Sequence, residues 1–171
     1  MCPKNNKMSL DNNSKEKIEE KIGEALGLEM AAQKAVQELS SKGLLNEHEM
    51  DGKLDGMREE ASNHQSKLEQ LVQKLSGSLD FAKIQETAQE TEQKASEMMK
   101  TYLGKDPDSS EAIEFLCLAE GGEVTHYEVL STLATKKFKN KQFSNTVNSI
   151  LREEKRHLQL CTRLAIQIAV S

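Results

Sequence analysis

Apolar residues recur at alternating intervals of three and four along most of this chain, the spacing that places them on one face of an α-helix. Between residues 78 and 105 the pattern is weaker and the segment is rich in Glu, Gln and Lys, so we expect a peripheral helix that crosses between the others. The pattern predicts four longer amphipathic helices, over residues 15–42, 46–76, 109–138 and 141–169.

Residues typical of helix ends lie where this pattern stops. The Asn-Asn-Ser run at 12–14 offers N-caps for the first helix, and Gly43 and Gly77 are suited to end the first and second helices. The polar segment 1–14 lacks the apolar stretch of a signal peptide or membrane anchor. We expect it to be a disordered tail, which leaves residues 15–171 as one domain.

Four amphipathic helices joined by a short, a long and a short connection form two antiparallel pairs with a crossover between them. This is the ferritin-like up-and-down four-helix bundle with one long crossover, here containing an extra helix. The sequence therefore predicts an all-α fold of this type.

Composition agrees with helices and limits the partners. Charged residues make up 30% of the 171 residues and aromatic residues 4%, with no Trp and two Pro. A formal net charge of −5, with acidic and basic residues interspersed, disfavours nucleic acid. No apolar run is long enough to span a bilayer, and three widely spaced cysteines argue against a disulfide framework. We therefore predict a soluble, cytoplasmic protein with no nucleic-acid or membrane partner.

Each predicted core helix carries acidic or histidine residues on or beside its apolar face. These residues lie close to the helix midpoints, at about residues 28, 61, 123 and 155. Midpoints of helices of similar length lie at one level in a bundle, so these side chains are expected to meet in one layer. They are Glu29, Glu60 with His64, Glu123, and Glu154 with His157.

A buried layer of this composition needs positive charge. A carboxylate is costly to remove from water unless it is paired or bound to a metal, and no Lys or Arg falls on the apolar faces at this height. Two divalent cations would neutralise four carboxylates, with imidazoles completing their ligand shells. Such ligands suit iron or manganese, and one Glu from each of two helices plus Glu-x-x-His from the other two is a known recipe for such a site.

Each residue also has an interpretation without a metal. Glu29 reaches solvent if its helix rotates slightly, and His64 alone fits a hydrogen-bonded core histidine. Glu154 and His157 alone fit a surface pair. His126 is either an extra ligand or a hydrogen-bond donor to one. The positions taken together, at matched heights, favour the metal site.

Two short runs are similar to those of a known family. Glu123–Val129 (Glu-Val-Thr-His-Tyr-Glu-Val) and Leu151–Lys155 (Leu-Arg-Glu-Glu-Lys) resemble the His-Tyr-Glu and Glu-Glu-Glu-Lys runs of the YciE/YciF stress-response family. Segments beginning at Glu29 and Glu59 resemble its first two helices. The resemblance covers about residues 18–170 and implies a rubrerythrin-like four-helix bundle, a homodimer and a di-iron centre.

The chain departs from that family at three places. The family's Glu before His-Tyr-Glu is Thr125 here, which leaves the third-helix ligand open between Glu123 and Glu128. Periodicity points Glu128 outward and favours Glu123. The acidic and histidine residues of the second helix are four apart instead of three. His157 stands where the family has a threonine-type residue, and this restores Glu-x-x-His.

These features predict a protein with two iron (or manganese) ions that reacts with dioxygen or peroxide in oxidative-stress defence. Either Glu123 or Glu154 bridges the metals, and the terminal ligands are two capping carboxylates and two imidazoles: Glu29, Glu60, His64 and His157. The chain has no Cys-x-x-Cys pair, so an external electron donor is expected. Peroxidase, oxidase and ferroxidase activities stay open. The alternative is a metal-free helical-bundle interaction or structural protein, in which the polar layer fixes the helix register.

Overall fold

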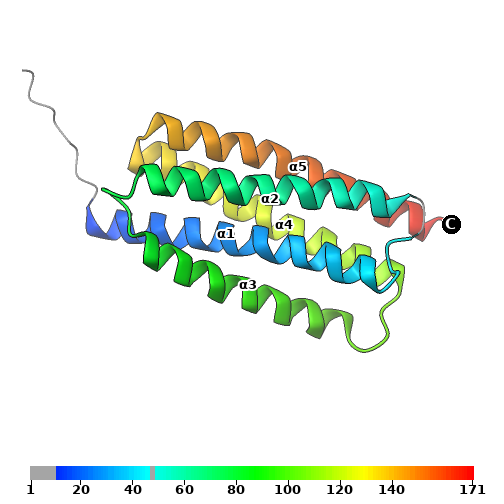
Figure 1. Cartoon of the computed structure of the whole chain (residues 1–171). Coiled ribbons are helices and arrows are strands. Elements are labelled where there is room, and N and C mark those ends of the chain that lie inside the picture. The colour runs from blue at the N-terminus through cyan, green and yellow to red at the C-terminus, as the bar shows by residue number, and fades with distance from the viewer. Residues whose placement is uncertain (1–10, 47–48) are drawn as a thin grey trace, which may run out of the picture.

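The computed structural model describes residues 11–46 and 49–171, and every regular element in these ranges is helical, which confirms the all-α class (Figure 1). None of the described helices is long and apolar enough to cross a lipid bilayer. A single π-helical segment, η1 (Ala134–Phe138), joins the last two helices. The α-helices are α1 (Asn12–Ser41), α2 (Met50–Lys74), α3 (Phe81–Leu103), α4 (Ser109–Leu133) and α5 (Lys141–Ala169).

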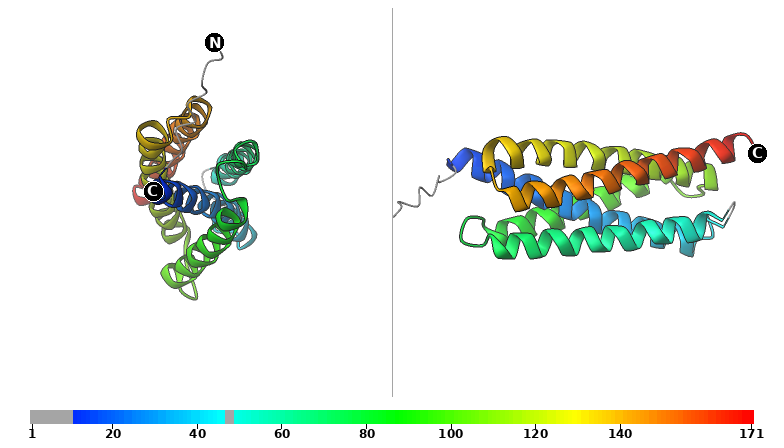
Figure 2. Two further views of the ribbon diagram at one scale, coloured as in Figure 1. Left: turned by 90° about the vertical axis from the view of Figure 1, so that its left-hand side faces the viewer. Right: turned by 90° about the horizontal axis from the view of Figure 1, so that it is seen from above.

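Successive helices run in opposite directions along the length of the molecule (Figures 1 and 2). Because α3 carries the chain back along this length, α4 runs in the same direction as α2, and α5 in the same direction as α1. Helix α1 packs against α2, α3 and α4, while α5 packs against α4 and α2. The helices α1, α2, α4 and α5 therefore enclose the core, and α3 covers the outside of α1.

The N-terminus of α1 lies slightly earlier than the sequence indicated. Asp11 caps this helix by accepting a hydrogen bond from the Ser14 backbone N–H at 2.9 Å, so residues 12–14 are already helical. Residues 1–10, most of the predicted tail, lie outside the described residues. Side-chain caps of the same kind begin α3, α4 and α5, and they are Asp80, Asp108 and Asn140.

The core consists of two apolar clusters, one in each half of the bundle. On α1 the first cluster ends at Leu26 and the second begins at Ala35. A similar interruption occurs on each of the other enclosing helices, between Met57 and Leu68, Leu116 and Tyr127, and Ile150 and Cys161. The interruptions face one another, so a separate layer lies between the clusters at mid-height.

Helix α3 packs closely on α1 although its sequence pattern is weak. A Cβ atom added at Gly23 would lie 2.5 Å from Cβ of Thr87, and one added at Gly27 would overlap the carbonyl oxygen of Ala88. Such distances are shorter than real contacts, so only glycine permits this approach. The two glycines therefore seat the first half of α3 against α1.

Replacing Gly27 by Ala is expected to destabilise the fold, although Ala favours a helix over Gly by about 1 kcal/mol. The added methyl group has no room, so we expect the free energy of unfolding to fall by about 1–3 kcal/mol, measured by urea denaturation. Gly56→Ala in α2 is the matched control, because nothing lies within 4 Å of a Cβ there, and it is expected to be neutral or stabilising. Equal stabilisation by both changes would contradict this packing.

Candidate metal centre

Six titratable side chains occupy the layer between the two apolar clusters, and none of them is more than 5% exposed. Among the described residues, no Lys or Arg is buried. The six come from all four enclosing helices: Glu29 from α1, His64 from α2, Glu120 and Glu123 from α4, and Glu154 and His157 from α5. Five of these residues were predicted as ligands from the sequence, and the structure adds Glu120.

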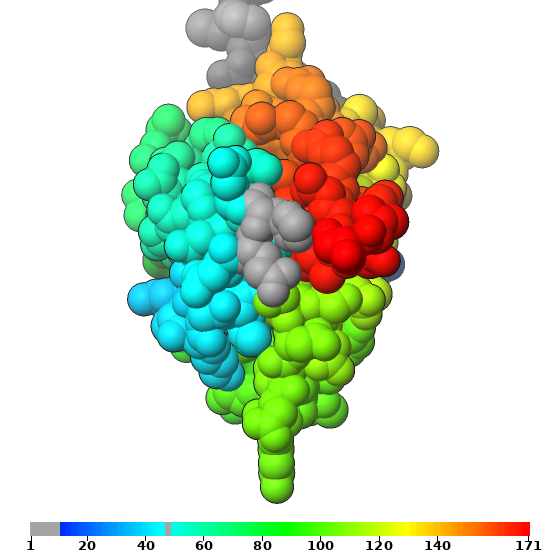
Figure 3. Space-filling view, turned by 90° about the vertical axis from the view of Figure 1, so that its right-hand side faces the viewer, coloured from blue at the N-terminus to red at the C-terminus, as the bar shows by residue number. Residues whose placement is uncertain are grey.

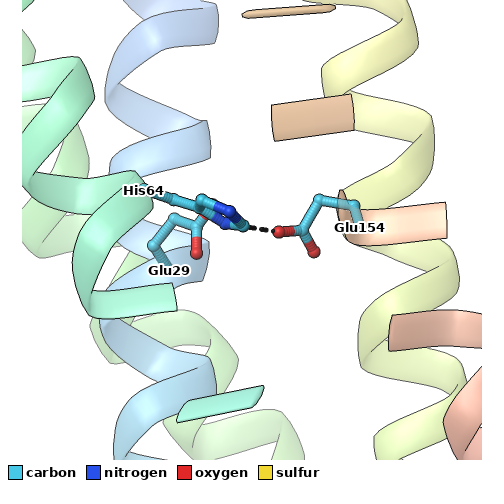
Figure 4. Close-up of side chains that lie close together, drawn as sticks. All are labelled: Glu29, His64 and Glu154. Atoms are coloured by element: carbon cyan, nitrogen blue, oxygen red, sulfur yellow. Dashed lines mark ion pairs between the residues drawn. The ribbon is translucent and has the colours of Figure 1, made fainter. Parts of the chain in front are cut away.

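Glu29, His64 and Glu154 converge from three helices (Figure 4). Nδ1 of His64 lies 2.7 Å from Oε1 of Glu154 and 3.3 Å from Oε1 of Glu29. Each residue offers one ligand atom, and the three atoms lie within 4.8 Å of one another. Two oxygens and one nitrogen at this separation can coordinate a single metal ion.

A second group of three shares Glu154 with the first. Nδ1 of His157 lies 3.5 Å from Oε2 of Glu154 and 3.7 Å from Oε2 of Glu120. Ligand atoms of these three residues again lie within 4.8 Å of one another. Because opposite oxygens of Glu154 face the two imidazoles, this carboxylate lies between two groups that could each hold a metal ion.

The outer nitrogen of each imidazole is held by a carboxylate. Nε2 of His64 lies 2.7 Å from Oε2 of Glu153, and Nε2 of His157 lies 2.6 Å from Oε2 of Glu60. A carboxylate at Nε2 favours a proton on that nitrogen, which leaves the Nδ1 lone pair facing the centre. Both imidazoles are therefore oriented as metal ligands commonly are.

Several inward-facing atoms of this layer have no hydrogen bond. They include Oε2 of Glu29, Oε2 of Glu120 and both carboxylate oxygens of Glu154. Nδ1 of His64 is close to Glu154 but lacks hydrogen-bond geometry. Each buried polar atom left without a partner costs about 1–3 kcal/mol, and more when charged.

Glu19 shows how this chain treats a buried carboxylate elsewhere. Its Oε1 accepts a hydrogen bond from the Asp80 backbone N–H at 2.8 Å, and Lys15 lies 3.6 Å away. Burial of a carboxylate in this protein does not by itself leave oxygens without partners. The oxygens of the central layer that lack hydrogen bonds could instead be satisfied by a bound cation.

Burial raises the pKa of the Glu29 carboxyl, and the nearby charge of Glu154 brings it to about 7. Glu120 and Glu123 are shifted in the same direction, because burial is reinforced by the Glu154 charge beside them. Burial opposes ionisation of Glu154 too, but the nearby imidazoles of His157 and His64 outweigh it and lower its pKa to about 2. Without a metal, burial and mutual repulsion thus limit how many of these carboxyl groups are ionised at one time.

The imidazoles are shifted toward the protonated form. Burial alone would lower the pKa of His64, but Glu154, Glu29 and Glu153 raise it to about 10. Burial likewise acts against protonation of His157, and Glu154 and Glu60 raise its pKa. A bound cation would displace these protons, since metal ligation requires neutral imidazole.

Tyr127 fixes the position of Glu29. Its hydroxyl donates a hydrogen bond to Oε1 of Glu29 at 2.5 Å in a fully buried environment. Burial, followed by the charge of Glu29, raises the pKa of this phenol, so it stays a donor. Tyr127 thus holds the Glu29 carboxyl beside His64 through Oε1, while Oε2 has no hydrogen bond.

Four residues considered from the sequence lie outside the two groups: Glu123 is buried in the layer beside them, and the other three are partly exposed. Glu60, 39% exposed at its side chain, binds His157 and, at 3.2 Å, Arg156, as an outer partner. Nδ1–H of His126 donates to the Gly122 carbonyl oxygen at 2.9 Å, and its Nε2 is 3.3 Å from Glu24. Glu128 is 55% exposed and forms an ion pair with Lys155 at 2.8 Å, so it faces outward as its periodicity indicated.

Two residues of the centre were not selected from the sequence. Glu120 lies on the apolar face of its helix, one turn before Glu123, and this position was a usable signal. Glu153 precedes Glu154 and lies off the apolar face. Only the three-dimensional arrangement shows that it reaches His64 on another helix.

Comparisons of the chain with protein-family models, with curated proteins and with solved structures found no match. Assignment of the centre therefore depends on its own geometry and charge.

The metal-free protein is expected to lose stability as the pH rises from 5 to 9. The pKa values of Glu29, Glu120 and Glu123 are raised in the folded protein, whereas in the unfolded chain these carboxyl groups lose their protons near the ordinary pKa of 4.5. The folded state therefore binds more protons above this pH, and rising pH destabilises it. The stabilisation that protonated His64 gives to the fold is complete below pH 6.5, and it is lost as the pH rises toward the folded pKa of about 10. Glu154 is already ionised in both states across this range.

Thermal unfolding in the presence of a chelator tests this expectation. The melting temperature should fall steadily from pH 5 to 9, whereas the increase caused by added Zn²⁺ should grow, because protons and metal compete for the same atoms. A melting temperature that rises with pH in the chelated protein would contradict the shifted pKa values.

Proposed function

We propose that this chain is a ferritin-like di-iron carboxylate protein, with manganese as the alternative metal, that reacts with dioxygen or peroxide in oxidative-stress defence. The observation that carries the proposal is that Glu154 belongs to both three-residue groups, so it can bridge two metals. The directions of the four enclosing helices, with α3 as the crossover, support a ferritin-like topology (Figure 1). Membership of the YciE/YciF family and a homodimer are part of the same proposal.

The ligand set fits a dinuclear centre in number and charge. Glu29 and His64 hold one ion, Glu120 and His157 hold the other, and Glu154 lies between them. With Glu123, which is buried beside them, four carboxylates offset two divalent cations. The set departs from the usual recipe because α2 has Ala61 three residues before His64, while α4 supplies two acidic residues instead of one.

The bound metals supply redox chemistry and open positions for the oxidant. The chain's own residues hold and orient them. Glu153 and Glu60 fix the two imidazoles, and Tyr127 fixes Glu29. A groove of about 390 Å³ between α2 and α5 is lined by Glu60 and His157, and it gives a small oxidant a path from solvent to the edge of the layer.

Electrons for turnover come from outside the chain in this proposal. The two cysteines in the described ranges, Cys117 and Cys161, are both free thiols. Burial raises the pKa of each thiol, so neither is a reactive thiolate at neutral pH. A protein or small-molecule reductant is therefore expected to serve the centre.

Glu154→Gln is expected to abolish binding of both ions, because it removes the charge shared by both positions. Wild-type protein loaded anaerobically with ferrous iron should contain about two ions per chain, measured by elemental analysis after desalting. Glu128→Gln, a change at an exposed carboxylate, is the matched control and should keep both ions. Two ions retained in Glu154→Gln would contradict the bridging role. A wild-type protein that folds but binds no metal ion would contradict the proposal and favour the alternative, a metal-free helical bundle.

Changing the outer carboxylates should weaken metal binding without changing its stoichiometry. Glu60→Gln and Glu153→Gln each remove a charged partner of one imidazole, and such changes cost about 10–100-fold in metal affinity. Titration with Co²⁺, followed by visible absorption with a competing chelator, measures the dissociation constants. Glu59→Gln, an exposed neighbour of Glu60, is the control. Unchanged affinity in both test variants would show that these carboxylates do not support the ligands.

A further inference from the structure

A second cavity lies on the opposite side of the layer from the α2–α5 groove. It has a volume of about 600 Å³ and is bounded by α1, α3 and α4. We call it the α1–α3–α4 pocket, and residues from Leu28 to Glu38, from Gln89 to Lys100 and from Phe115 to Glu123 line it. Its volume lies in the range of about 300–1,000 Å³ typical of small-molecule sites.

The course of α3 creates this pocket. Closest contact between α3 and α1 occurs at Gly27, which meets Ala88, Thr91 and Glu92. Beyond this point α3 diverges from α1 (Figure 1), and the connection from α3 to α4 forms a projection at that end of the molecule (Figure 3). An ion pair of 2.8 Å between Lys34 and Glu92 spans α1 and α3 at the edge of the opening. The first half of α3 is thus fixed while the second half leaves a space.

The lining of the pocket is apolar inside and polar at the rim. All three helices contribute alanines, whose small side chains leave the space open, among them Ala31, Ala35, Ala95 and Ala119. Met99 and Phe115, both buried, add larger apolar surface. Such a lining favours the apolar body of a ligand.

Glu123 connects the pocket with the centre. It is 2% exposed, and it both lines this pocket and lies in the central layer beside Glu120, Glu154 and His157. Glu123 belongs to neither group of three ligands. Its carboxyl group lies beside Glu154 and also borders the pocket, so a polar atom of a molecule in the pocket can reach it.

We propose that the α1–α3–α4 pocket binds a small, mainly apolar molecule with one hydrogen-bonding head group, a hydroxyl or hydroperoxyl, placed at Glu123. The apolar lining takes the body of the molecule, and Glu123 holds the head beside the central layer. That this pocket is the substrate site of the metal centre rests on the proposed function. That it binds such a molecule at all rests only on the cavity and its lining.

The probe for this proposal is 2-naphthol, which has an aromatic body and a single hydroxyl. The chain contains no Trp, so naphthol fluorescence can be followed in a titration of the full chain. Both the zinc-loaded and the chelator-treated protein are titrated, because Zn²⁺ brings no redox reaction. Saturable binding of one 2-naphthol per chain by at least one form is expected.

Variants of the lining locate the probe. Ala119→Phe fills the pocket and should weaken 2-naphthol binding at least tenfold, and Ala95→Phe from the opposite wall serves if the first variant does not fold. Ala82→Phe, at an exposed alanine of α3 outside the pocket, is the matched control and should bind as wild type does. Glu123→Leu should weaken binding of 2-naphthol but not of naphthalene, which lacks the head group.

Absence of binding in both forms would overturn the proposal, as would equal binding by wild type and both pocket-filling variants. Loss of 2-naphthol and naphthalene alike in Glu123→Leu would remove the role of this carboxyl. Zinc content, measured in the same samples, separates the two proposals. Binding of 2-naphthol without binding of metal would contradict the proposed function and support the ligand pocket. Binding of metal without binding of 2-naphthol would support the metal centre and contradict the ligand pocket.

Discussion

The cost of keeping carboxylates out of water governs this structure. Four acidic side chains lie in one layer of the bundle, and in the described part of the chain the only basic groups buried with them are two imidazoles. The shifts of their pKa values in opposite directions show how protons are distributed when nothing else neutralises the layer. An apolar layer at this height would avoid that cost, and two divalent cations would supply the charge that the carboxylates lack.

Helix α5 contributes most to this layer through a short stretch of its sequence. Glu154 and His157 lie one turn apart on the same face, and Glu154 directs one oxygen toward each half of the centre. The adjacent Glu153 reaches sideways to His64 of α2. In the proposed centre, one turn of this helix would thus provide the shared ligand, one terminal ligand and one outer partner, and the other three helices would add one or two residues each.

The sequence predicted the helices well because their apolar faces repeat regularly, and the fourth predicted helix, 141–169, coincides with α5. Matching of helix midpoints also placed Glu29, His64 and Glu154 at one level. It did not distinguish a residue that enters the layer from one that supports it, because Glu60 lies on the edge of its helix face and contacts His157 from outside. The seating of α3 depends on Gly23 and Gly27, whose effect appears only when the neighbouring helix is present.

The division of the core into two apolar clusters has a mechanical consequence. Each half of the bundle has its own hydrophobic contacts, and between them the enclosing helices meet through charged groups. Local opening in proteins follows such cooperative units. Each enclosing helix runs through both clusters, so a cation bound in the ionic layer between them would strengthen the coupling of the two halves.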